Sequence, residues 1–240
     1  MQEIILISLF NLVAAIIFII AAGKMYAVVV NKKEKVSILY FFYGLVFIAL
    51  YLIVKSLPGI ILTDGFFVNA SAALFSPLLL IGGMFFFLIP FNLLKLKKIE
   101  RVYIVFMLCM VAVSSFLNFW GLRGKDSIYR GADYWVILKD PFLDYGSLLI
   151  GALFALSLFT ATAFYFYFAY QKRKKEVAFG RAIMIGAACL FLFIGGLTEN
   201  VIGLFVENFF VVETVTSISY IMGAITLVAS INYKGEKVKK

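Results

Sequence analysis

Seven long apolar stretches alternate with short polar segments along this chain of 240 residues. A helix needs about 20 consecutive apolar residues to cross a bilayer, and each stretch is long enough to do so. Inside a bilayer the backbone groups must be satisfied within the segment itself, so such stretches predict α-helices. The predicted spans are residues 4–30, 36–57, 70–94, 102–121, 146–170, 179–205 and 209–233. We therefore predict an all-α, polytopic membrane protein whose seven-helix bundle forms a single domain over residues 1–240.

Basic side chains gather in the polar segments that follow the first, third, fifth and seventh stretches. The central members of these inner basic loops are Lys32, Lys33, Lys97, Lys98, Lys172, Arg173, Lys174 and Lys175, and a lysine-rich tail follows residue 233. Cytoplasmic loops collect Lys and Arg, so the pattern places the N-terminus outside and the C-terminus inside. We expect a multi-pass protein of the cell (plasma or inner) membrane, with its basic loops attracted to an anionic inner leaflet.

Composition supports a membrane protein and argues against nucleic acid as a partner. The chain is 64% hydrophobic and 15% charged, whereas soluble domains are roughly 45–50% apolar and about 25% charged. The net charge of +9 would suggest nucleic-acid binding in a soluble protein. Here the excess of Lys and Arg in the predicted inner loops accounts for it.

Several kinds of chemistry lack the residues that they need. The chain has no histidine, which removes the commonest metal ligand and general base. Cys109 and Cys189 lie alone in separate spans, without a Cys-x-x-Cys pair. Residues 209–232 contain no lysine that could hold retinal. We predict a protein that is not an enzyme, with no catalytic residue, no bound metal and no cofactor.

A few polar side chains inside the predicted spans are the candidates for a functional site. Charge inside a bilayer is costly, so an ionisable residue there is a functional hypothesis by default. The candidate ligand-binding residues near the predicted outer surface are Asn11, Asn118, Glu199, Asn200 and Glu213. They either converge on an outward-facing polar cavity, with Lys55 or Arg123 as counter-charge, or fix helix packing through hydrogen bonds, or reach the headgroups. In the first case Glu199 would be able to sense or carry protons.

The predicted outer loop over residues 122–145 is the longest connection in the chain. It contains Tyr129, Arg130, Tyr134 and Trp135, and its Tyr-Arg-Gly-Ala-Asp-Tyr stretch is typical of a hairpin turn between short aromatic strands. Loops longer than about 12–15 residues are often functional or specially folded. We interpret this loop as a lid over the helix ends, with a ligand-contacting loop as the alternative.

A local sequence match joins the topology to a known family. The stretch from Asp140 to Gly146, Asp-Pro-Phe-Leu-Asp-Tyr-Gly, leads into an aromatic span that ends in Tyr170-Gln-Lys-Arg-Lys-Lys175. With the external N-terminus and short basic inner loops, it resembles the seven-transmembrane N-terminal sensor region of bacterial and archaeal histidine kinases. The resemblance covers most of the chain as topology. The resemblance implies that catalysis belongs to an attached cytoplasmic domain. The sequence up to Lys240 contains no such domain, so we expect a membrane or cytoplasmic signalling partner.

The sequence therefore predicts an integral membrane sensor-like or partner-binding module without its own output domain. A ligand would enter between the outer helix ends, and helix shifts about Gly and Pro positions would alter the inner basic loops. The alternative is a small-solute or ion permease that uses Glu199 as its coupling group. A lipid-modifying enzyme is a third hypothesis, which requires two convergent carboxylates. A permease predicts a polar path across the bilayer, whereas a sensor predicts a dead-end outer site.

Overall fold

A computed structural model of the chain describes residues 2–31, 36–60, 65–122, 141–202, 205 and 209–234, which contain seven long α-helices and no strand. The helices are α1 (Gln2–Asn31), α2 (Val36–Ile60), α3 (Gly65–Leu93), α4 (Lys97–Leu122), α5 (Pro141–Gln171), α6 (Glu176–Asn200) and α7 (Phe209–Asn232). Each holds an apolar segment of 20 to 24 residues, long enough to cross a membrane. The predicted all-α seven-helix bundle is confirmed, and the chain is a multi-pass membrane protein.

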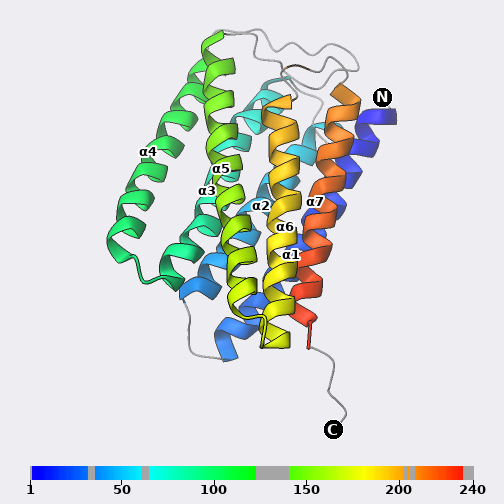
Figure 1. Ribbon diagram of the computed structural model, residues 1–240. Coiled ribbons are helices and arrows are strands. Elements are labelled where there is room, and N and C mark those ends of the chain that lie inside the picture. Colours follow the sequence, from blue (N-terminus) through cyan, green and yellow to red (C-terminus); the bar gives the residue numbers. More distant parts are fainter. Residues whose placement is uncertain are drawn as a thin grey trace.

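Successive helices run up and down the bundle (Figure 1). Helices α1, α2, α3, α5, α6 and α7 form a closed ring, because each packs against its neighbour in this order and α7 packs against α1. Helix α4 lies outside the ring, chiefly against α3. Its outward side chains are strongly exposed, as for Val102 at 71%. The loops around residues 95–98 and 172–175 lie at one end of the bundle, which we call the basic end.

Several helices extend beyond the predicted spans. Helix α3 begins at Gly65 and α5 begins at Pro141, so parts of residues 58–69, which lie between two predicted spans, and of the predicted loop 122–145 are helical. Pro suits the first helical position, where the missing N–H would have no helical partner. The added turns, residues 65–69 and 141–145, are largely apolar, so the predicted spans were drawn too short at these ends. The predicted aromatic hairpin falls on residues 123–140, outside the described part of the chain.

Small residues let three helices close around one aromatic side chain. The Phe154 ring on α5 packs against Gly83 on α3 and Gly196 on α6. A Cβ atom at either glycine would lie 2.6 Å from the ring. Close approach at small residues is a common way for membrane helices to pack, because lipid provides no hydrophobic force between them. This contact packs α6, the helix that carries Glu199, against α3 and α5 in the ring of helices.

Candidate functional site

A buried lysine lies near the end of the bundle opposite the basic end. Lys55 occupies the penultimate turn of α2, and its side chain has no exposed surface. Its Nζ atom lies 2.8 Å from Oε1 of Glu199 on α6 and 2.7 Å from Oε2 of Glu213 on α7. Three helices that are distant in sequence thus meet at one nitrogen atom. The predicted counter-charge and the two predicted glutamates form one site.

Two tyrosine hydroxyls complete the surroundings of Glu199. Tyr51, one turn before Lys55 on α2, donates a hydrogen bond to the Glu199 carboxylate, and Tyr220 on α7 donates another at 3.3 Å. Both tyrosines are fully buried, and their rings meet edge to face at 6.1 Å. Glu199 itself keeps 16% of its side chain exposed. We call Tyr51, Lys55, Glu199, Glu213 and Tyr220 the charge cluster.

The charge cluster is unbalanced. Ion pairs removed from water are tolerated only where the charges are paired and hydrogen-bonded. Two carboxylates here share one ammonium group, so the cluster carries one net negative charge when all three groups are ionised. Among the described residues Glu199 accepts from Lys55 and both tyrosines, whereas Glu213 is paired with Lys55 alone. Within these five residues, therefore, the carboxylates outnumber the cations by one.

A second polar contact joins α1 to α7 beside the charge cluster. Ser217, one turn after Glu213, donates a hydrogen bond of 2.9 Å to Oδ1 of Asn11. Both side chains are buried. Within the described residues, the Nδ2 group of Asn11 and the hydroxyl of Thr216 are buried without a hydrogen-bond partner. The two sets of contacts thus join polar side chains of α1, α2, α6 and α7.

Other predicted site residues lie elsewhere or outside the described part of the chain. The backbones of Asn118 and Asn200 belong to α4 and α6, but their side chains are outside that part. The lid residues Tyr129, Arg130, Tyr134 and Trp135, with Arg123, Lys32 and Lys33, also fall outside it. Lys97, Lys98, Arg173, Lys174 and Lys175 are exposed at the basic end, and Lys172 is partly buried there.

Sequence reasoning missed the two tyrosines. The chain has 13 tyrosines, so residue type alone does not single out Tyr51 or Tyr220. Spacing offers a signal, because Tyr51 precedes Lys55 by four residues and therefore shares its helix face. Tyr220 follows Glu213 by seven residues and lies on the same face of α7 for the same reason.

The core becomes apolar from the charge cluster toward the basic end. The buried side chains in this direction along α2, α6 and α7 include Ile48, Leu45, Leu192, Cys189, Ala224 and Leu227, all in one hydrophobic cluster. Buried hydroxyls nearer the basic end, Thr162 and Ser230, donate to carbonyls of their own helices. In the described residues no polar path leads from the charge cluster through the bundle.

No group of three metal-binding side chains of the His, Cys, Asp and Glu types occurs among the described residues. Comparison of the chain with protein-family models, curated proteins and solved structures finds no match. Fold and site alone therefore define its class. It is a seven-helix multi-pass membrane protein with a buried charge cluster near one end of the bundle.

Proposed function

We propose that this chain is a sensor-like or partner-binding membrane module in which the state of the charge cluster sets the position of α7. The observation that carries the proposal is that α7 is held by polar contacts at both ends. Near its start, Glu213 pairs with Lys55. At its other end, Oδ1 of Asn232 accepts a hydrogen bond from Lys24 at 3.0 Å, and the Tyr233 carbonyl accepts one from Nε of Arg181 at 3.0 Å.

Helix α7 has the length to connect the two ends. Its 24 residues span about 36 Å at ~1.5 Å per residue. The Tyr233 ring, just beyond the helix, also packs on Gly180 of α6. A change at Glu213 that weakens the pair with Lys55 therefore acts on a rigid element anchored at the basic end. Packed helices respond to such changes by discrete shifts of about 1–2 Å.

The trigger is a ligand that interacts differently with the paired and unpaired arrangements, since only differential binding shifts a conformational equilibrium. A proton or a cation fits this role, because the charge cluster has an excess carboxylate. A cytoplasmic or membrane partner that contacts the inner basic loops would then detect the change. The predicted orientation places those loops on the cytoplasmic side.

The two alternative functions fit the geometry less well. A permease that couples transport to Glu199 needs a polar path, and the buried core beyond the charge cluster is apolar. A lipid-modifying enzyme needs convergent carboxylates, and Glu199 and Glu213 do converge. Lys55 lies between them within 3 Å of each, however, and Glu199 is further engaged by Tyr51 and Tyr220. These contacts leave neither carboxylate free to act on a substrate.

The proposal is tested by the distance between spin labels at the basic end. Labels are attached at Lys97→Cys, at the start of α4, and at Lys234→Cys, beyond α7, with Cys109 and Cys189 replaced by alanine. We expect Glu213→Gln to shift or widen the distance distribution by about 2 Å in nanodiscs. Ser115→Ala is the control, because among the described residues the Ser115 hydroxyl bonds to the Val111 carbonyl of its own helix.

Two results would overturn the proposal. The first is an unchanged distance distribution in a folded Glu213→Gln protein, which would mean that α7 does not respond to the charge cluster. The second is proton or solute flux into proteoliposomes that disappears in Glu199→Gln, which would identify a permease.

A further inference from the structure

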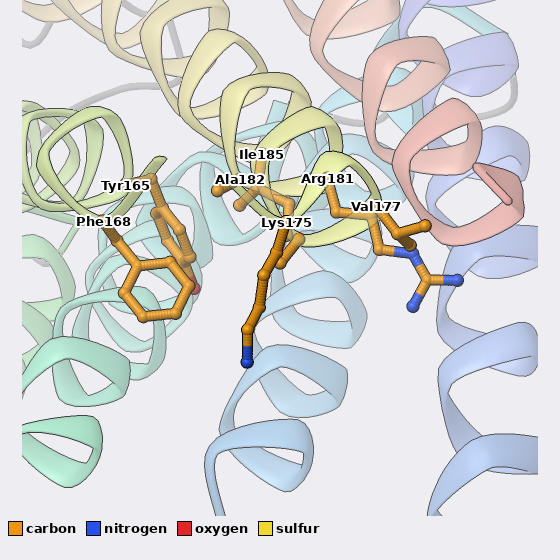
Figure 2. A pocket seen from close by; sticks show the side chains of 8 residues that line it. Tyr165, Phe168, Lys175, Val177, Arg181, Ala182 and Ile185 are labelled. Carbon is orange, nitrogen blue, oxygen red and sulfur yellow. The ribbon is translucent and has the colours of Figure 1, made fainter. Parts of the chain in front are cut away.

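A groove opens between α5 and α6 at the basic end, far from the charge cluster. It has a volume of about 440 Å³ and is lined by Tyr165, Phe168, Lys175, Val177, Ala178, Arg181, Ala182 and Ile185. Figure 2 shows the Tyr165 and Phe168 rings on one side, Arg181 on the other and Lys175 between them. We propose that this α5–α6 groove binds one anionic phospholipid, with the phosphate at Lys175 and Arg181 and an acyl chain along the apolar wall.

The lining of the groove is amphipathic. Tyr165 and Ala182 are buried and form an apolar floor, whereas Lys175 and Arg181 are exposed. Two of the eight lining residues are cations and none is a carboxylate. Glu176 adjoins Lys175 in sequence but does not line the groove. A ligand that matches this lining has a negative headgroup and an apolar tail.

Backbone geometry adds to the positive character of the groove. Val177 and Ala178 belong to the first turn of α6, where backbone N–H groups have no carbonyl partner within the helix. The N-terminal end of a helix attracts phosphate because these groups and the helix dipole both favour negative charge. The two basic side chains and the helix start thus favour the same kind of headgroup.

The Arg181 side chain is restrained by a contact with the end of α7. Its Nε donates to the carbonyl of Tyr233, which fixes the guanidinium plane. Arginine has five N–H donors. The donors on its terminal nitrogens form no other hydrogen bond with the described residues, and a phosphate accepts two parallel bonds from such a group. The same contact ties an occupied groove to the end of α7.

The position of the groove agrees with a lipid rather than a soluble anion. It lies at the start of the α6 membrane span, which begins at Glu176, where the chain turns back from α5. Large apolar side chains nearby on α5, such as Tyr167 and Tyr170, are exposed toward the surroundings of the bundle. Anionic headgroups of the predicted inner leaflet are concentrated at this level.

Native mass spectrometry of the full chain tests the proposal, with phosphatidylglycerol and phosphatidylcholine as probes. We expect one retained phosphatidylglycerol per chain and weaker retention of phosphatidylcholine. Lys175→Gln and Arg181→Gln should each weaken phosphatidylglycerol binding by about fivefold, the loss expected for one basic group near the headgroups. Lys174→Gln is the matched control, since Lys174 is exposed in the same loop but does not line the groove.

Three results would overturn the assignment. An equal loss in Lys174→Gln would mean that the basic loop attracts lipid diffusely. Equal retention of phosphatidylcholine would show that the charged rim contributes nothing. Displacement of the lipid by millimolar inorganic phosphate would identify a free-anion site. Because Lys175 is exposed on a turn, we expect Lys175→Gln to leave the fold intact, which keeps the test independent of Arg181 and its contact with α7.

Discussion

The ammonium group of Lys55 on α2 lies 2.7 Å from the carboxylate of Glu213 on α7. Both side chains are almost completely buried. The pair joins two helices that have no extensive backbone contact with each other. Its partner Glu199 brings in a third helix. Removal of Lys55 leaves two buried carboxylates without their counter-charge, whereas removal of Glu213 leaves Lys55 paired with Glu199.

Lys55→Met should therefore destabilise the protein by about 3–5 kcal/mol, because it leaves two carboxylates facing each other. Adding Glu213→Gln should recover part of this loss, because one of the two charges disappears. Thermal unfolding in detergent measures both effects, and the double-mutant cycle measures the coupling. If the two substitutions are simply additive, the pair does not interact in the folded protein.

The two tyrosine hydroxyls should contribute unequally. Tyr51→Phe removes a hydrogen bond to an ionised group and should lower the free energy of unfolding by about 1.5–3 kcal/mol. Tyr220→Phe should cost less, because its bond to Glu199 is longer, at 3.3 Å. Both variants keep the ring packing between Tyr51 and Tyr220. An equal or reversed order in unfolding experiments would contradict the geometry of Glu199.

Close helix packing around Phe154 gives a prediction that is independent of charge. Gly196→Ala should destabilise the bundle by about 1–3 kcal/mol, because its Cβ would lie 2.6 Å from the ring. Adding Phe154→Leu should relieve part of the overlap. Gly23→Ala is the control, since no atom lies within 4 Å of its Cβ position. There alanine should be neutral or stabilising by up to about 1 kcal/mol.

The predicted orientation can be measured with a membrane-impermeant maleimide in a background without native cysteines. We expect Gln2→Cys to react in intact cells and Lys174→Cys to react only after permeabilisation, because basic loops remain cytoplasmic. The opposite pattern would invert the topology. The charge cluster would then face the cytoplasm, and the basic loops would be external.

Local pattern made much of the fold predictable. The apolar stretches identify the spans because the bilayer imposes the same length and composition on every helix that crosses it. Helix ends such as Gly65 and Pro141 were less predictable, since the turns that follow them are largely apolar and hydropathy does not mark where such a helix begins. Glu199 and Glu213 stood out because charge is rare inside a span. Three possibilities were open for them, namely an outward-facing polar cavity with Lys55 or Arg123 as counter-charge, interhelical contacts that fix packing, or contact with the headgroups, and the residue types did not choose among these.

The sequence by itself determined the class of the protein and the identity of its unusual buried charges, because hydropathy and ionisation are properties of single residues and short segments. Only the tertiary structure decided that α2, α6 and α7 bring these charges to one nitrogen atom, that Tyr51 and Tyr220 join them, and that α5 and α6 leave a basic groove at the other end. The physical reason is that membrane helices of similar hydropathy can pack in many orders. The order is selected by side-chain shape, as where Phe154 meets Gly83 and Gly196, and by the pairing of buried charge.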